Sequence, residues 1–179
     1  MDWTVAGILG FVAEHRDWAF WIVALLGLID STAFLSVFLP STPLLVGLGA
    51  LVAAGSLDFA PIWAGATVGA VIGSTFSWWV GHHYGSAILQ RRPFSLRPEL
   101  TARASAAFNR WGVWVILVGH IFSPLTAAVF LIAGVSKISF WRFQAVNFPG
   151  ALAKAYLIPK TGEWGGQLAH MLWVWVTGP

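Results

Sequence analysis

Long apolar runs dominate the chain, and two of them are interrupted by short segments that contain proline. Trp18–Leu39 is followed by Pro40-Ser41-Thr42-Pro43 and then by Leu44–Leu57, and Val113–Val135 contains Ser123-Pro124-Leu125-Thr126. Irregular backbone inside a bilayer lacks hydrogen-bond partners, so it persists only where protein or a watery cavity surrounds it. The pattern predicts two broken-helix hairpins, with Pro40, Pro43 and Pro124 at the breaks.

The apolar piece after the first break is short for a membrane span, which needs roughly 20 residues. Leu44–Leu57 therefore fits either a re-entrant hairpin that returns to its own side or a full span with a short return. We favour the re-entrant hairpin. Lys137 and Arg142 closely follow the second interrupted run, so we expect a second re-entrant hairpin there.

Asp58 and Pro61 open a helix that we expect to continue through Trp79. Gly65, Gly69 and Gly73 recur on one face of it. Small residues at this spacing let another helix approach closely. The glycine face fits an internal helix contact and the interface of a homo-oligomer equally well.

The C-terminal part of the chain predicts a span over Phe143–Leu157, interrupted at Pro149-Gly150, and a separate short piece over Trp164–Val176. Sliding the chain on itself by 124 − 43 = 81 residues aligns Pro43 with Pro124 and Phe59 with Phe140. Each half then contains a broken hairpin, a short polar link and a spanning helix. Inverted repeats of this kind are typical of transporters.

The composition agrees with a membrane protein. Of 179 residues, 58% are hydrophobic and only 9% are charged, whereas a soluble domain carries roughly 25% charged residues. We expect an all-α, polytopic integral membrane protein with an interfacial segment over 1–17, a membrane domain over 18–166 and an apolar segment over 167–179. The N-terminus lacks the pattern of a signal peptide, and cysteine is absent.

Residues 82–110 form the main polar segment, which contains five arginines against one acid. The positive-inside rule places this loop on the cytoplasmic side of a bacterial inner membrane. Pro98–Arg110 has the spacing of an amphipathic interfacial helix. Topology and anionic lipid headgroups explain these cations, so we expect no nucleic-acid partner.

Three ionisable residues lie deep within apolar stretches: Asp30, His120 and Lys154. Such groups usually pair with one another or line a cavity. In a functional interpretation Asp30 carries a coupling proton, while His120 or Lys154 contacts an anionic headgroup. In a structural interpretation Asp30 and Lys154 merely join two helices, and a neutral His120 binds a backbone carbonyl. The hydroxyls near the breaks are further candidate anion contacts: Ser41, Thr42, Ser123 and Thr126.

Catalytic patterns are missing from the sequence. There are no paired carboxylates, no Gly-x-Ser-x-Gly turn and no phosphate-binding glycine loop. His82 and His83 are adjacent and point to different sides of a helix, which makes them a poor metal pair. We expect no enzyme, no metal and no cofactor.

Several segments together resemble the DedA family, whose domain also occurs in lipid scramblases of the VTT type. They are Asp30–Phe34 with Pro40-Ser41-Thr42, Gly69–Gly73, Trp79–Gly85, Gly119–Leu125, Ala133–Ser136, and Asn147 with Gly150-Ala151. The resemblance implies two re-entrant hairpins that meet from opposite faces. It also implies lipid translocation, in bacteria chiefly of undecaprenyl phosphate, with proton dependence proposed for several members.

The chain departs from the family pattern at charged positions. Asp30 stands where the family usually has Glu, Ser74 replaces an acid, and Lys154 replaces a Trp. His120 and Thr126 replace two arginines, which removes bidentate phosphate recognition. We expect a transporter or flippase for an anionic lipid phosphate. The alternatives are a passive phospholipid scramblase and a membrane scaffold without transport.

Overall fold

The computed structural model describes residues 5–32, 41–90, 98–121 and 123–177, and within these ranges the chain forms only helices and turns. This confirms the expected all-α class. The helices are α1 (Val5–Glu14), η1 (Arg16–Trp18), α2 (Ala19–Ser31), α3 (Ser41–Ala53), α4 (Phe59–Tyr84), η2 (Gly85–Gln90), α5 (Pro98–Trp111), α6 (Trp114–Ile121), α7 (Ser123–Val135) and α8 (Phe140–Thr177).

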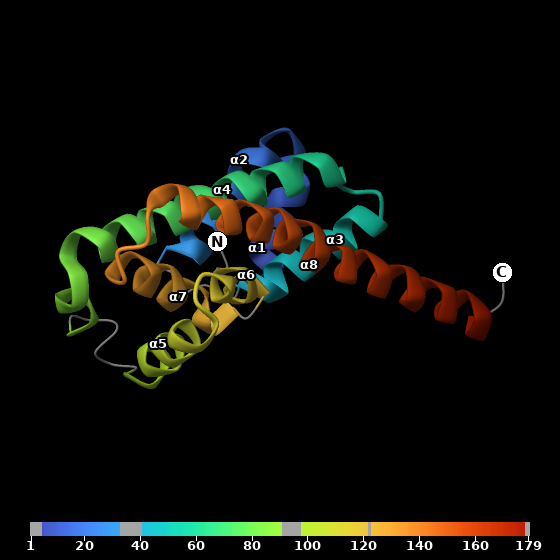
Figure 1. Ribbon diagram of the computed structural model, residues 1–179. Helices are drawn as coiled ribbons and strands as arrows, with labels where there is room; N and C mark the ends of the chain where they lie inside the picture. The colour runs from blue at the N-terminus through green and yellow to red at the C-terminus, as the bar shows by residue number, and fades with distance from the viewer. Residues whose placement is uncertain (1–4, 33–40, 91–97, 122, 178–179) are drawn as a thin grey trace.

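Helix α4 is the centre of the fold and packs against α2, α7 and α8 (Figure 1). It runs antiparallel to α8, because Trp63 Nε1 donates to the Leu152 carbonyl at 3.4 Å and Gln144 Nε2 donates to Thr75 Oγ1 at 2.7 Å. Among the described residues, one helix, Phe59–Leu89, is long and apolar enough to cross a membrane.

The glycine face of α4 is filled by α2 of the same chain. A Cβ added at Gly65, Gly69 or Gly73 would overlap the backbone of Phe20, Ala24 or Leu28, respectively. Apolar side chains gain little from meeting one another in lipid, so close van der Waals contact through small residues is what holds such helices together. The contact runs along both helices in the same direction, which makes α2 and α4 parallel.

Two further helix pairs are joined by reciprocal glycine contacts. Between α4 and α7, Gly81 lies on the Leu131 carbonyl and Gly134 lies on the Trp78 carbonyl. The α3–α8 contact is built in the same way. There, Gly49 lies on the Pro159 carbonyl and Gly162 on the Val46 carbonyl. Helices α3 and α7 are thereby attached to α8 and α4, respectively.

Helices α3 and α7 each contain 13 residues and end in the same kind of turn. In the first, Gly55 has φ 71° and the Ser56 N–H donates to the Leu51 carbonyl at 3.0 Å. In the second, Lys137 has φ 56° and the Ile138 N–H donates to the Ala133 carbonyl at 3.3 Å. Both are Schellman caps, and each leads directly into a long helix.

The two turns lie at opposite ends of α4. The turn after α3 leads into the first residue of α4, whereas Lys137 Nζ donates to the carbonyl of His82 in the last turn of α4. Trp78 Nε1 also donates to the Ile138 carbonyl, at 3.2 Å. The turn that joins α3 to α4 and the turn that joins α7 to α8 therefore lie at opposite ends of α4.

Pro43 and Pro124 lie just inside the helices that follow the two predicted breaks. Helix α3 begins at Ser41 and α7 begins at Ser123, so each proline lies in a first helical turn. The N–H groups of a first turn have no intrahelical partner, so proline removes nothing there. Pro40 lies outside the described residues.

The expected interruption at Pro149-Gly150 is wrong, because α8 continues through Pro149 and Pro159 to Thr177. Pro149 is exposed, whereas Gly150 beside it touches the His120 ring of α6, and Pro159 is buried against Gly49 of α3. Neighbouring helices of this kind make proline tolerable in a membrane helix. The expected boundary between 166 and 167 falls within α8, whose C-terminal part extends beyond the other helices (Figure 1).

Many large apolar side chains remain exposed on the outside of the helices. The outer faces of α2 and α4 carry Trp21, Leu25, Ile72, Phe76 and Trp79, which are 47–65% exposed. Soluble monomers rarely expose apolar patches of this extent. The amphipathic helix expected over Pro98–Arg110 is α5, which buries Ala104 and exposes Arg103 and Arg110.

Candidate functional site

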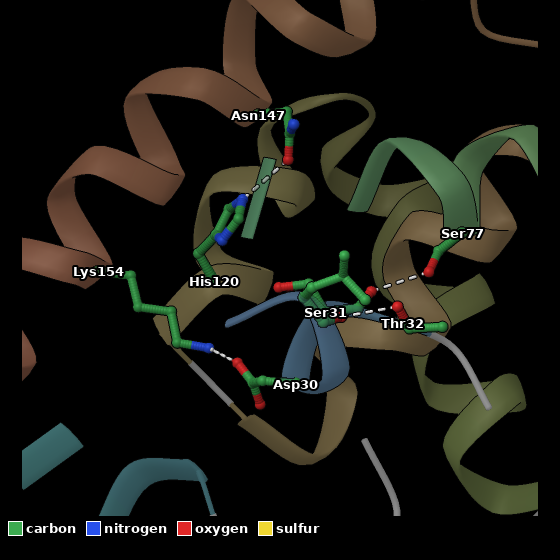
Figure 2. Close-up of polar contacts among 8 residues, drawn as sticks. Asp30, Ser31, Thr32, Ser77, His120, Asn147 and Lys154 are labelled. Carbon is green, nitrogen blue, oxygen red and sulfur yellow. Dashed lines mark hydrogen bonds and ion pairs between the residues drawn. The ribbon is translucent and has the colours of Figure 1, made fainter. Parts of the chain in front are cut away.

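Asp30 and His120 occupy the same place in two different helices. Each is the second-last residue, Asp30 in α2 and His120 in α6. Asp30 is 4% exposed and His120 is fully buried. Both side chains reach toward α8, as Figure 2 shows.

Lys154 of α8 forms an ion pair with Asp30. Its Nζ donates to Asp30 Oδ2, and the two side chains are only 3% and 5% exposed. Removing one partner from such a pair leaves an uncompensated buried charge, which is strongly destabilising. Asp30 and Lys154 therefore form the ion pair between helices that the structural interpretation described.

His120 belongs to a chain of hydrogen bonds that joins α6, α8 and α4. His120 Nε2 lies 3.0 Å from Asn147 Oδ1, and Asn147 Nδ2 donates to Gln144 Oε1 at 2.8 Å. Gln144 Nε2 donates to Thr75 Oγ1, which donates to the Val71 carbonyl at 2.6 Å. His120 therefore binds a side-chain amide rather than the backbone carbonyl that the structural interpretation had offered as one alternative.

The ion pair and the histidine form one cluster. Asn147 and Lys154 are seven residues apart on α8, about two helical turns, so they share a face. Gly150 lies between them against the His120 ring, and the charges of both Lys154 and Asp30 act on that ring. One face of α8 thus holds the ends of both short helices.

The cluster lies well inside the span of α4. Ser77 Oγ donates to the carbonyl of Ser31, next to Asp30, at 2.8 Å, and Thr75 ends the His120 network. With a rise of about 1.5 Å per residue, both α4 residues are at least about 10 Å from either end of the helix.

An apolar cleft of about 400 Å³, counted with its open mouth, adjoins the ion pair. Asp30 and Lys154 are its charged lining residues. The other lining residues are Leu26, Gly27, Leu44, Leu45, Leu48, Ala66, Ala70, Ala151 and Ala155. The part of the cleft that a water-sized sphere can enter has room for about one water molecule.

The four candidate hydroxyls occupy the beginnings of two helices. Ser41 and Thr42 lie in the first turn of α3, and Ser123 and Thr126 lie in the first turn of α7. Their side chains lie outside the described residues. Ser74 is fully buried and donates to the Val71 carbonyl at 3.1 Å.

The sequence interpretation did not assign to the site the polar residues that hold His120, which are Asn147, Gln144 and Thr75; it named Asn147 only as part of the family resemblance. A detectable signal was present, because Asn147 lies seven residues before Lys154 in a predicted helix and is polar among apolar neighbours. Within the described ranges, no group of three or more His, Cys, Asp or Glu side chains is arranged to hold a metal ion.

Comparison with known protein families shows to which family the chain belongs. The model of the VTT domain matches residues 39–162. The chain belongs to the VTT-domain (DedA) family. The match covers α3 to α7 and includes His120, Asn147 and Lys154, whereas Asp30 precedes it.

Curated relatives of this VTT-domain protein are membrane proteins by name. The chain is 25% identical to the inner membrane protein YabI of Escherichia coli over 94% of its own length and 73% of YabI. It is 29% identical to an uncharacterized membrane protein of Mycobacterium bovis over 75% of its own length and 64% of the relative.

A Buchnera aphidicola membrane protein is 19% identical over 81% of the chain and 57% of the relative. The chain thus spans less than two thirds of two of these three relatives. No solved structure matches it significantly. The names of the relatives support the membrane location that the composition predicts.

Proposed function

We propose that this VTT-domain protein moves a lipid with an anionic phosphate headgroup across the bacterial inner membrane. Undecaprenyl phosphate is the cargo that the family resemblance favours. The observation that carries the proposal is the buried Asp30–Lys154 pair beside an apolar cleft. A lysine ammonium is a competent partner for phosphate, and apolar walls suit a lipid chain. Transport of this kind requires no chemical reaction.

Asp30 is the competitor of the phosphate in this mechanism. While Asp30 is ionised, its carboxylate occupies Lys154. Protonation of Asp30 removes that negative charge and frees the ammonium for a phosphate oxygen. Proton and headgroup then bind together. Protonation of Asp30 frees Lys154 for the headgroup, and a headgroup bound to Lys154 favours the protonated form of Asp30. Release of the headgroup returns Lys154 to Asp30 and closes the cleft.

The two turns at the ends of α4 support a proposed arrangement in the membrane. Helix α4 has 26 residues, a length of about 39 Å, and the hydrocarbon core of a bilayer is about 30 Å thick. With α4 across the bilayer, the Gly55 and Lys137 turns lie at opposite faces. The α2–α3 and α6–α7 segments then form inverted re-entrant hairpins that meet at the polar cluster.

The arginine-rich segment sets the orientation. Residues 82–110 follow the C-terminal end of α4, where Lys137 also lies. The positive-inside rule places this end in the cytoplasm. The polar cluster is then near the middle of the bilayer. A headgroup that crosses the membrane must be able to reach this position from either side.

Reconstitution into proteoliposomes tests the proposal. Translocation of a polyprenyl phosphate is measured for the wild type, Asp30→Asn and Lys154→Ala at pH 6 and pH 8. We expect pH-dependent transport in the wild type and its loss in both variants. Lys160→Ala is the matched control, because Lys160 forms a similar pair with Glu163 on α8 but does not line the cleft.

Two other results would replace the proposal. Equal movement of lipids with any headgroup, unaffected by Asp30→Asn, would indicate a passive scramblase. No lipid movement, together with cellular complementation by the Asp30/His120/Lys154 triple variant, would indicate a scaffold.

A further inference from the structure

The second nitrogen of the His120 ring has no hydrogen-bond partner among the described residues. Its Nδ1 is buried, and the whole side chain is inaccessible to solvent. A buried polar atom without a partner costs about 1–3 kcal/mol in general, and such an atom in a native structure requires an explanation. A ligand that binds to this nitrogen is one such explanation.

The hydrogen-bond chain determines what this nitrogen can bind. Asn147 directs its Nδ2 donor to Gln144, so its Oδ1 acceptor faces His120. His120 must therefore carry its proton on Nε2. A proton on Nδ1 as well would place a second, unpartnered N–H donor in the interior. His120 is thus a neutral imidazole whose Nδ1 lone pair accepts a hydrogen bond.

The charges near His120 favour a headgroup with a single negative charge. Lys154 is the cation of the cluster, and Asp30 lies against it. A phosphate dianion would bring two negative charges toward one ammonium and one lone pair. A phosphate monoester with one proton carries a single charge and a P–OH donor.

We propose that Asn147 positions His120 as a hydrogen-bond acceptor, and that His120 Nδ1 selects the singly protonated form of a phosphate monoester headgroup. The P–OH group donates to Nδ1 while an unprotonated phosphate oxygen binds Lys154. This inference rests on the proposed function and specifies the protonation state of its substrate. Gln144 also contributes to the positioning of His120, because it fixes the orientation of the Asn147 amide.

A pair of matched lipids tests the selectivity. Both carry the same polyprenyl chain, one as the phosphate monoester and the other as its methyl diester. At about pH 5 nearly all of each lipid carries a single charge, since the second ionisation of a phosphate monoester lies near pH 6. Only the monoester has a P–OH group. In proteoliposomes we expect the wild type to move the monoester about tenfold faster, the effect of one charge-assisted hydrogen bond.

Variants of the positioning residue separate its role from simple packing. Asn147→Asp gives His120 a carboxylate partner that favours the doubly protonated ring, which donates at Nδ1. We expect this variant to lose the preference for the monoester while still moving lipid phosphate. Ser74→Ala is the control, because it removes a buried hydroxyl of the same helix that donates to the Val71 carbonyl and lies outside the His120–Asn147–Gln144–Thr75 chain. We expect it to retain the preference.

Nitrogen-15 NMR of histidine-labelled protein in detergent reports on the ring directly. His120→Gln identifies the His120 signal among the five histidines. We expect the Nε2–H tautomer in the wild type, and a shift of Nδ1 on addition of a short-chain phosphate monoester but not of its diester. A proton on Nδ1, or equal transport of both lipids, would overturn the inference and leave the proposed function standing. Failure of all lipid phosphate transport, with the Nδ1 shift present, would overturn the proposed function alone.

Discussion

Asn147 and Lys154 lie on one face of α8, and each holds the end of a different short helix. Asn147 binds His120 of α6, and Lys154 binds Asp30 of α2. The two contacts differ in kind, since one is a neutral hydrogen bond and the other is an ion pair. A sliding or tilting of α8 would strain both contacts together, which couples α2 to α6.

Replacing one partner of the buried ion pair will destabilise the protein. Lys154→Met leaves Asp30 charged and unpaired, at a cost of about 3–5 kcal/mol. The double variant Asp30→Leu/Lys154→Met removes both charges and is expected to be nearly as stable as the wild type. Thermal unfolding in detergent measures both variants. A double variant that is less stable than Lys154→Met would show that the charges themselves support the fold.

The same double variant separates stability from transport. Its fold is expected to be intact, yet it has neither a proton acceptor nor a cation in the cleft. We expect no lipid phosphate transport from it. Substantial transport by the stable double variant would contradict the assignment of both residues to the site.

Gly69→Ala will lower the stability of the α2–α4 contact. The added Cβ would overlap the Ala24 carbonyl, which belongs to the backbone and cannot rotate away. Gly10→Ala in α1 is the control, since a Cβ there meets nothing within 4 Å and alanine favours a helix by about 1 kcal/mol over glycine. We expect a lower unfolding midpoint for the first variant and an unchanged or higher one for the second. Equal midpoints would mean that the helices separate easily.

Lys137 has a left-handed backbone that glycine adopts without strain. Its φ is 56°, and its counterpart in the first turn is Gly55. Lys137→Gly and Lys137→Ala both remove the contact to the His82 carbonyl, but only glycine relieves the strain, which is about 1–2 kcal/mol. The glycine variant should therefore unfold at a higher temperature than the alanine variant. The reverse order would indicate that the turn has a different conformation in the membrane.

Cysteine labelling will report the two turns on opposite sides of the membrane. The chain has no cysteine, so single substitutions can be labelled without a modified background. Ala54→Cys and Ser136→Cys place exposed thiols in the two turns. With an impermeant reagent on intact cells, we expect Ala54→Cys to react and Ser136→Cys to react only after lysis. Reaction of both from one side would exclude the inverted arrangement.

The sequence alone determined the class of the protein and the rough position of its helices. Composition required an apolar environment, because so few charged residues cannot solvate a surface of this size. The spacing of Gly65, Gly69 and Gly73 indicated close packing, and isolation within apolar runs identified Asp30, His120 and Lys154. These are properties of local sequence, since they depend on residue type and helical period.

Only the tertiary structure decided which of these residues meet. Asp30 and Lys154 are 124 residues apart in the chain, and no local rule pairs Lys154 with Asp30 rather than with another acid. The role of Asn147 also required the fold, because an amide becomes a partner of His120 only when α6 and α8 pack together. The path of α8 through Pro159 depended on its neighbours in the same way, because Pro159 is buried against Gly49 of α3, and surrounding helices decide whether a proline ends a helix or is accommodated within it.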